Sequence, residues 1–292
     1  AMRTLVNTVP IFTGVTGQRA RTALAGTRFG DVRWVAETGS TNVDLMDLAR
    51  DGQPEGVVLV ADHQSSGQGR HGRVWTAPPG ASLLVSVLLR PPAAVAAVTT
   101  MAGGVAMVAA LEEVAGLMAR LKWPNDLVWP GDGTVTDRKL GGILAEADWP
   151  AGSNISAGWR EPGPAERVVV VAGVGVNVNW PAELPQELAD LAVAVDHVTG
   201  QHTDREDLLI SFLRNLDRRY GQLVATRDRQ PLLDEWRERS ATLGRRVRVD
   251  LGSDDIEGLA ADVTDEGHLV IETLEGTRRT VAVGDIVHLR PG

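Results

Sequence analysis

The sequence predicts an α+β protein that ends in a small β-barrel. Short apolar strands alternate with longer helical stretches as far as residue 243. After Gly244, five short strands with alternating apolar residues follow one another closely, separated by turns rich in glycine and acidic residues, which is typical of a small barrel. We therefore expect an N-terminal arm over residues 1–30, a large domain over 31–243 and a small domain over 244–292.

Caps, periodicity and chain breakers predict the individual elements in order. Ser40, Thr41 and Asn42 cap a helix whose apolar residues recur at helical spacing until Gly52 ends it. Residues 95–118 predict one core helix, because this apolar stretch is longer than an ordinary strand. The expected elements are a short helix within the arm, strands 33–35, 56–61 and 82–89, the core helix, strands 121–123 and 139–147 on either side of a hairpin tip at 131–133, strand 167–179, helices 183–194, 205–223 and 231–243, and barrel strands 246–249, 256–263, 268–273, 278–283 and 286–289.

Composition narrows the class of protein. The chain has 292 residues, with 29 basic against 38 acidic side chains, and the net charge of -9 argues against a broad surface for nucleic acid or anionic membrane. The absence of cysteine excludes a disulfide framework and a thiol nucleophile and favours a cytoplasmic protein. No apolar run has the length of a membrane span, and no signal-peptide pattern opens the chain.

The two lysines stand out against this background. Arginine supplies every basic residue except Lys122 and Lys139. A compact ammonium group differs from a guanidinium fork in geometry and hydration, so a rare lysine indicates a position where the ammonium is needed. The alternative is that two lysines remain by chance.

The first candidate binding segment is a glycine loop over residues 67–75. Its Gly-x-Gly-x-x-Gly pattern is that of a dinucleotide fingerprint, but it runs toward Pro78 and Pro79 instead of opening a helix, so that interpretation fails. What remains is a flexible loop that carries Arg70, Arg73 and Trp75 to one ligand, and such a loop can close over an anion. A solvated turn with two arginines is the equally common alternative.

Three further segments contain candidate polar groups. Lys122 opens the turn that ends in Asn125 and Asp126, Lys139 precedes a pair of glycines, and residues 173–179 combine glycines with two asparagines. Taken singly, these segments are also compatible with an ordinary turn and a tightly packed strand. The chain has no Walker A loop, no Gly-x-Ser-x-Gly elbow and no histidine cluster with the spacing of a metal site.

In combination, the segments resemble the biotin protein ligases, also called biotin–acetyl-CoA-carboxylase ligases. The resemblance spans residue 32 to the C-terminus and rests on Gly-x-Gly-Arg-x-Gly-Arg-x-Trp, Lys-Trp-Pro-Asn-Asp and Arg-Lys-Leu-x-Gly-Ile-Leu in this order. It implies a class II synthetase-like fold, with a mixed, mostly antiparallel sheet and packed helices, followed by an SH3-like barrel. The chain shows no N-terminal winged helix, so the resemblance is to the form of the family that does not bind DNA.

The resemblance also implies an activity and a set of site residues. The family uses ATP, with Mg²⁺ on its phosphates, to convert biotin into biotinyl-5′-AMP, and then transfers biotin to a lysine of a biotin carboxyl carrier domain, as found in acyl-CoA and pyruvate carboxylases. No protein-only metal site and no membrane partner are implied. By resemblance, the biotin-binding residues are Ser40, Thr41, Asn42, Gln64, Gly67, Gln68, Gly69, Arg70, Trp75, Lys139 and Gly142; the ATP- and adenylate-binding residues are Arg70, Arg73, Trp75, Lys122, Asn125, Lys139, Gly175 and Asn177; and the catalytic residues are Lys139, Arg70 and Asp126.

Two other functions stay open on the sequence. A lipoate–protein ligase shares the adenylate chemistry, but a lipoyl chain has no ureido group for Ser40, Thr41 and Gln64 to bind. A non-catalytic, regulatory biotin-binding module is the second alternative, and the retention of both lysines and Arg70 argues against it.

Overall fold

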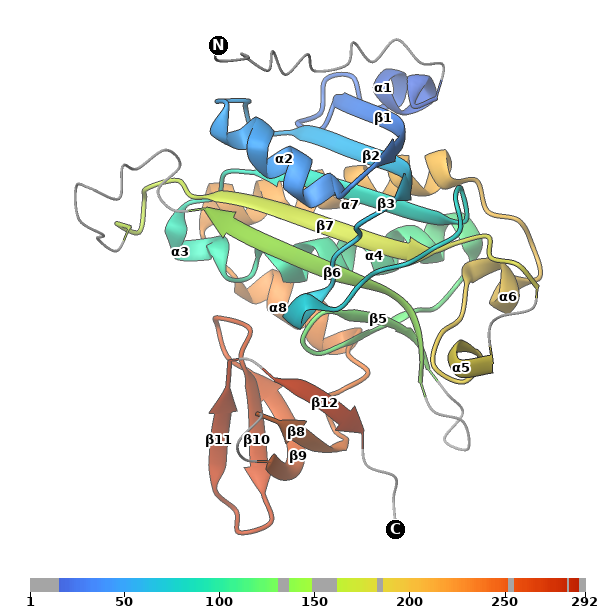
Figure 1. Cartoon of the computed structure of the whole chain (residues 1–292). Helices are drawn as coiled ribbons and strands as arrows, with labels where there is room; N and C mark the ends of the chain where they lie inside the picture. The colour runs from blue at the N-terminus through green and yellow to red at the C-terminus, as the bar shows by residue number, and fades with distance from the viewer. Residues whose placement is uncertain are drawn as a thin grey trace, which may run out of the picture.

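A seven-stranded sheet covered by helices forms the larger part of the molecule, and a separate five-stranded sheet follows it (Figure 1). This computed structural model describes residues 16–130, 137–148, 162–182, 186–251, 255–282 and 284–288. The strands of the large sheet are β1 (Asp31–Thr38), β2 (Val57–Gln64), β3 (Ser82–Leu89), β4 (Arg120–Lys122), β5 (Asp126–Trp129), β6 (Arg138–Asp148) and β7 (Val169–Asn177), in the spatial order β1-β2-β3-β7-β6-β5-β4.

The large sheet is mixed and mostly antiparallel, as predicted. Within the described residues β1 and β2 pair in parallel, and the other neighbouring strands pair antiparallel. Strand β3 is buried along its whole length, which explains its nearly continuous apolar sequence, because a central strand covered on both faces has no solvent side. The pairing of β3 with β7 and of β7 with β6 forms the centre of the sheet.

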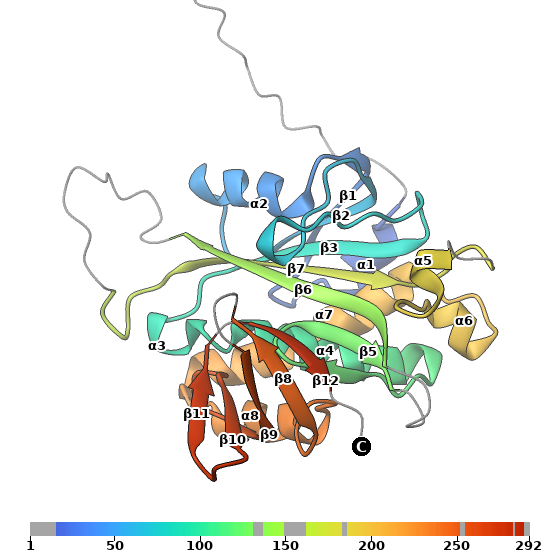
Figure 2. The same cartoon turned by 60° about the horizontal axis from the view of Figure 1, so that its bottom comes forward.

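Helices cover both faces of this sheet. Figure 2 shows α2 (Thr41–Arg50) on one side and α4 (Thr99–Ala115), α7 (Arg205–Thr226) and α8 (Gln230–Glu238) on the other. Leu45, Met46 and Ala49 of α2 pack on β2, β3 and β7 in one apolar cluster, while the other helices share a larger core with the opposite face. The short helix α1 (Gln18–Ala23), which lies where the sequence predicts a helix in the arm, packs near α7.

The C-terminal sheet consists of five antiparallel strands in the order β11-β10-β9-β8-β12. They are β8 (Arg246–Asp250), β9 (Asp255–Val263), β10 (Leu269–Thr273), β11 (Arg278–Val281) and β12 (Asp285–His288). All five predicted barrel strands are present, each within a few residues of its expected bounds. The division of the chain between Leu243 and Gly244 stays a prediction.

Three predicted helices are wrong in extent. The expected core helix 95–118 is two helices, α3 (Ala93–Ala96) and α4, because Val98 leaves helical geometry and Gly116, at φ 62, ends α4. The expected helix 183–194 is wrong in extent, and its residues 183–185 lie outside the described part of the chain. Within the described residues the chain forms only α5 (Gln186–Ala189), then runs alongside Lys139 of β6, and turns into α6 (Val195–Thr199). The helix expected over 231–243 ends earlier, at Glu238 of α8. The carbonyl of Arg239 and the N–H of Ala241 form hydrogen bonds with the backbone of Leu121 instead of continuing the helix.

Strand β5 was missed by the sequence analysis. The sequence predicts a direct hairpin between 121–123 and 139–147, but β5 lies between these strands and pairs with both. Its four residues are too few to show a period, and the turn that separates it from β4 looks like a loop. The expected hairpin tip at 131–133 lies outside the described residues. Among the described helices, none is long and apolar enough to cross a membrane.

Tyr220 offers a test of the helix packing. Its hydroxyl, in the fully buried side chain, donates to Glu55, which also accepts from the backbone N–H of Arg90 at 3.0 Å. Burial and the Glu55 carboxylate raise the pKa of Tyr220, so the hydroxyl keeps its proton. Tyr220→Phe is expected to lower the free energy of unfolding by about 1–2 kcal/mol. Thr226→Val removes an exposed hydroxyl in the same helix and is the control. Equal urea midpoints for the two variants would contradict this.

Candidate active site

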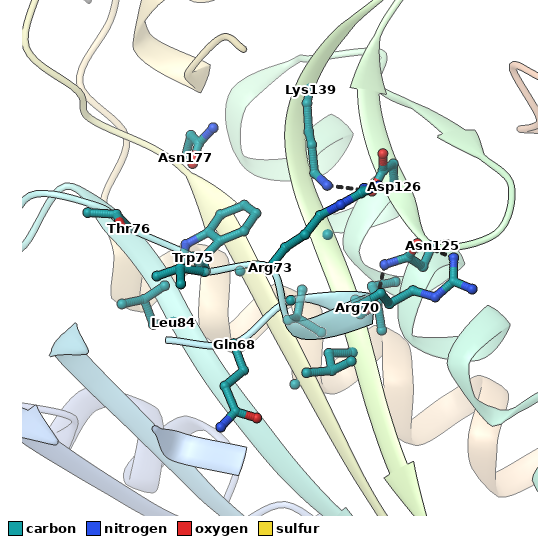
Figure 3. Close-up of a pocket in the computed structure, with 18 of the residues that line it drawn as sticks. Gln68, Arg70, Arg73, Trp75, Thr76, Leu84, Asn125, Asp126, Lys139 and Asn177 are labelled. Carbon is teal, nitrogen blue, oxygen red and sulfur yellow. Dashed lines mark hydrogen bonds and ion pairs between the residues drawn. The ribbon is translucent and has the colours of Figure 1, made fainter. Parts of the chain in front are cut away.

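A cavity of about 720 Å³ lies beside the centre of the large sheet, where the glycine loop and the β4–β5 turn meet β6 and β7 (Figure 3). The sequence analysis predicts site residues in five separate segments, and the fold brings them together here. The predicted residues that line the cavity are Ser40, Thr41, Asn42, Gln64, Gln68, Gly69, Arg70, Arg73, Trp75, Lys122, Asn125, Asp126, Lys139, Gly142, Gly175 and Asn177. Gly67 does not line it; it begins the loop, and its carbonyl accepts from the N–H of Trp75.

Glycines on the central strands make room for side chains from other elements. A Cβ atom at Gly173 would lie 2.2 Å from Oδ1 of Asn42, and one at Gly175 would lie 3.0 Å from the indole of Trp75. At Gly141 the Cβ would lie 2.5 Å from a backbone oxygen of the neighbouring strand. The paired glycines in the sequence therefore mark a sheet surface on which side chains and backbone approach closely.

The glycine loop is a narrow backbone hairpin. The N–H of Trp75 donates to the carbonyl of Gly67 at 2.9 Å, and the N–H of Gly69 donates to the carbonyl of Arg73 at 2.7 Å. Gly67 must be glycine, because a Cβ there would lie 2.5 Å from the carbonyl oxygen of Trp75. The turn at His71, at φ 55, allows the loop to reverse. This hairpin carries Trp75 onto the sheet and directs Arg73 toward Asp126 (Figure 3).

One end of the cavity is a buried polar corner. Oε1 of Gln64 accepts from the backbone N–H of Thr41 at 2.8 Å and lies 2.9 Å from its hydroxyl. Oγ of Ser86 lies 2.7 Å from Oγ1 of Thr41 and 2.6 Å from Oδ1 of Asn42. Ser40 occupies the N-cap of α2, but no hydrogen bond from its side chain caps the helix. The predicted capping by this triplet is therefore wrong in detail, since Gln64 binds the first free N–H.

Ser86 is a site residue that the sequence analysis missed. It is fully buried in β3, and its hydroxyl orders both Thr41 and Asn42. The amide nitrogen of Asn42 in turn donates to the carbonyl of Leu144 and to Glu146. A lone hydroxyl in an apolar strand is the signal that could have identified it.

Lys139 lies near the middle of the cavity. Its Nζ is 2.6 Å from Oδ1 of Asp126 and 5.8 Å from the centre of the Trp75 ring. Its backbone is held on both sides, because its N–H donates to Leu191 and its carbonyl accepts from Val193. The absence of a side chain at Gly142 leaves space beneath the ammonium group, where a Cβ would lie 3.5 Å from Nζ.

The other cations surround the β4–β5 turn. Burial lowers the pKa of Lys122, and the positive charges of Lys139 and Arg245 lower it further, whereas Asp126 and Asp137 raise it. Nη1 of Arg70 lies 3.4 Å from Oδ1 of Asn125, whose amide nitrogen donates to the carbonyl of Ile143 at 2.8 Å. The cavity therefore holds several positive charges in a protein with a net charge of -9.

Among the residues that the structure describes, two buried polar atoms of the cavity have no protein partner. Oδ1 of Asn177 is an acceptor, and Nε1 of Trp75 is a donor. The amide nitrogen of Asn177 donates to the carbonyl of Val193, so its oxygen is held in one orientation. Because buried polar groups rarely stay unpaired, these two atoms indicate where a ligand supplies a donor and an acceptor.

The arrangement is that of a site for an extended ligand with an anionic centre. A polar corner and apolar walls can bind a neutral ring, while lysines and arginines stabilise negative charge that develops between the two ends. Within the described residues, no group of three histidine or carboxylate side chains could hold a metal ion by itself. The carboxylate in the cavity that could join a phosphate-bound cation is Asp126.

Comparisons with known proteins agree with this arrangement. Residues 35–152 match the model of the biotin/lipoate A/B protein ligase family, and residues 242–289 match the model of the biotin protein ligase C-terminal domain. These matches define the class as that of the cofactor–protein ligases.

Individual relatives show which cofactor–protein ligases the chain resembles. The chain is 37% identical to a biotin–acetyl-CoA-carboxylase ligase of Mycobacterium tuberculosis, over 91% of this chain and 92% of that protein. It is 32% identical to the bifunctional ligase/repressor BirA of Bacillus subtilis, over 82% of this chain and 69% of that protein. A solved structure of the Aquifex aeolicus biotin protein ligase in complex with biotin and ATP matches with a TM-score of 0.71 and 26% identity, covering 90% of this chain and 100% of that one. The chain belongs to the biotin protein ligase family.

Gly173 provides a test of the crowded sheet surface. Gly173→Ala is expected to displace Asn42 from its bonds with Ser86 and Leu144 and to lower the free energy of unfolding by about 1–3 kcal/mol. Gly103→Ala is the matched control, because a Cβ there meets nothing within 4 Å and alanine favours the helix. Chemical denaturation of both variants checks this. A Gly173→Ala protein as stable as the Gly103→Ala protein would show that the contact is not restrictive.

Proposed function

We propose that this protein activates biotin with ATP to form biotinyl-5′-AMP and then transfers biotin to a lysine of a biotin carboxyl carrier domain. The observation that supports this most is that Lys139, the buried polar corner and Asn177, whose amide oxygen has no protein partner among the described residues, line one and the same cavity. The family membership and the M. tuberculosis relative favour the same activity.

The polar corner suits the ureido ring of biotin. This ring has two N–H donors and one carbonyl acceptor, and the corner offers the oxygens of Thr41 and Asn42 as acceptors. Because Oε1 of Gln64 is engaged by Thr41, its amide nitrogen stays available as a donor. Ser40 completes the polar set. The apolar part of the ligand would pack on Trp75 and on the strands behind it.

The first step places negative charge beside the cations. A carboxylate oxygen of biotin attacks the α-phosphorus of ATP, the new P–O bond forms, and the bond to pyrophosphate breaks. Lys139 can follow charge between the carboxylate and the phosphate, while Arg70 and the backbone N–H of Gln68 would hold the same anions. The N–H of Gly69 would join them only if the loop gives up its bond to the carbonyl of Arg73. Arg73, Lys122 and Asn125 line the cavity where the remaining phosphates would lie.

The unpaired amide oxygen of Asn177 is a hydrogen-bond acceptor that the nucleotide base could use. The oxygen of Asn177 suits the amino group of adenine, and the indole of Trp75, next to Gly175, offers a flat apolar surface. A magnesium ion would bind chiefly to the ATP phosphates and water, with Asp126 as the protein carboxylate within reach, and would supply charge neutralisation there.

In the second step the neutral amine of the carrier lysine attacks the acyl carbon, the acyl–phosphate bond breaks, AMP leaves with the negative charge, and the new amide nitrogen releases one proton to the solvent. No protein nucleophile is needed. Asp126, which is paired with Lys139, is placed to orient the incoming amine. The carrier is proposed to be the domain of an acyl-CoA or pyruvate carboxylase, and DNA is not a proposed partner. The cytoplasmic location stays a prediction, and so does the three-part division of the chain at residues 30 and 243.

Neither alternative function finds support. The match to a biotin protein ligase C-terminal domain and the identity along nearly the whole chain favour biotin over lipoate. A non-catalytic module has no need of Lys139 and Asp126 at 2.6 Å beside the polar corner.

Mass spectrometry tests the function directly. An apo carrier domain incubated with the protein, biotin and ATP is expected to gain one biotin on one lysine. Omitting ATP, or replacing biotin with lipoate, should abolish the gain. Carriers of several carboxylases that all stay unmodified would refute the proposal.

The glycine loop is expected to become protected when ligand binds. Val74 is 75% exposed, and few hydrogen bonds close the hairpin, so its amides open easily. An adenylate would draw in the arginines and bury the loop. Hydrogen exchange of residues 67–80 should slow on addition of biotin and ATP, while helix α7, which lies outside the cavity, provides the unchanged reference. Equal exchange with and without ligand would contradict the expected closure.

Lys139 is expected to contribute most of the charge stabilisation in adenylate formation. Lys139→Ala should slow single-turnover adenylate formation by about 10²- to 10³-fold, as for the loss of one preorganised donor to a developing anion. Lys139→Arg should also be slow, because the broader guanidinium cannot occupy the place of the ammonium. Arg138→Ala removes the neighbouring cation and is the control. A Lys139→Ala enzyme that forms adenylate at the parental rate would exclude Lys139 from the mechanism.

A further inference from the structure

A chain of polar contacts joins the C-terminal sheet to both lysine-bearing segments of the cavity. The backbone N–H of Trp123 donates to Oγ1 of Thr242 at 3.0 Å, and this oxygen lies 3.4 Å from Nε2 of His288 in β12. On the other side of the imidazole, Nδ1 lies 2.9 Å from Oδ2 of Asp137. Arg245 donates to the same carboxylate oxygen at 2.7 Å. The side chain of Asp137 is only 6% exposed, and that of His288 is 12% exposed.

The contacts determine which imidazole nitrogen carries the proton. Nη1 of Arg245 also lies 3.2 Å from Nδ1, but it already donates to the Asp137 carboxylate at 2.7 Å. If Nδ1 lacked a proton, its lone pair would still face that carboxylate at 2.9 Å, which is repulsive. Nδ1–H therefore donates to Asp137, and Nε2 is left to accept from the hydroxyl of Thr242. Burial lowers the pKa of His288, as do the charges of Lys122 and Arg245, although Asp137 raises it. The ring is thus neutral at neutral pH.

Each end of this chain lies beside a lysine. Trp123 directly follows Lys122, and Asp137 lies two residues before Lys139. The two lysines belong to β4 and β6, which do not pair with each other because β5 lies between them. The pairing of β5 with β6 also shifts register between Leu127 and Val128, so a bulge lies in the part of the sheet that separates the two lysines.

The charges in this region depend on the same contacts. Asp137 raises the pKa of Lys122, whereas burial, Lys139 and Arg245 lower it. A displaced Asp137 would therefore weaken the positive charge at Lys122. The imidazole holds the carboxylate without adding a further positive charge.

We propose that His288 is a positioning residue for adenylate formation, which links Thr242 to Asp137 and thereby sets the spacing of Lys122 and Lys139. The inference rests on the proposed function, since it assigns the C-terminal sheet a part in holding ATP. It does not place His288 in contact with either substrate.

The test separates ATP use from biotin binding in the full-length protein. His288→Leu removes both contacts and is expected to raise the KM for ATP in adenylate formation on the order of 10-fold, the loss of one to two buried hydrogen bonds. The Kd for biotin should rise by less than the KM for ATP, because the polar corner that would bind the ureido ring lies in other elements and only the carboxylate of biotin would meet Lys139. His288→Asn keeps a donor toward Asp137 and should recover part of the loss. His202→Leu removes an exposed histidine and is the control.

Three results would overturn the proposed role of His288. A folded His288→Leu protein with parental ATP kinetics would overturn the proposal, and so would an equal loss of biotin and ATP affinity or a His288→Asn variant no better than leucine. If His288→Leu does not fold, Thr242→Val removes one link at nearly constant volume and should give the same split between ATP and biotin. A parental protein that forms no adenylate would refute the proposed function instead.

Discussion

The site depends on one steric constraint: the central strands carry glycine where side chains from other elements lie on the sheet. Asn42 of α2 and Trp75 of the glycine loop occupy the space that side chains at Gly173 and Gly175 would fill. The polar corner and the indole surface therefore lie on one continuous sheet surface. Without these glycines the corner would be displaced and the loop could not approach the sheet.

This surface concentrates positive charge in an otherwise acidic protein. The net charge of -9 repels large polyanions, whereas Lys139, Lys122 and Arg70 meet at one cavity. Each cation has a nearby polar partner that holds it in place: Asp126 for Lys139, Asn125 for Arg70, and the more distant acidic groups for Lys122. Such preorganised charge is suited to stabilising an anion that forms between two bound substrates.

Much of the fold was predictable because its signals are local. The helix after Ser40, the buried run of β3 and the five C-terminal strands each have a distinct period or composition. Strand β5 was not predictable, since four residues show no period. The helix expected over 183–194 is too long at its C-terminal end, because the helical pattern is outweighed there by the pairing of residues 191–193 with Lys139.

The candidate site could be predicted in part, by its rare lysines and its glycines. The residues that support the site could not be predicted, because their role depends on contacts between segments that are far apart in the sequence. Ser86 is an ordinary hydroxyl in the sequence, and it acquires a role only when α2 packs on β3. Asp137 and His288 lie 151 residues apart and meet only because the fold brings β12 next to the residue that precedes β6.

The central claim is that the polar corner and the cations act together on one substrate pair, biotin and ATP. Release of pyrophosphate from ATP by the purified protein measures this most directly. The account predicts release that requires biotin and is not supported by lipoate, because only biotin engages the ureido-binding corner. Release at the same rate without biotin, equal release with lipoate, or no release with biotin and magnesium present would contradict it.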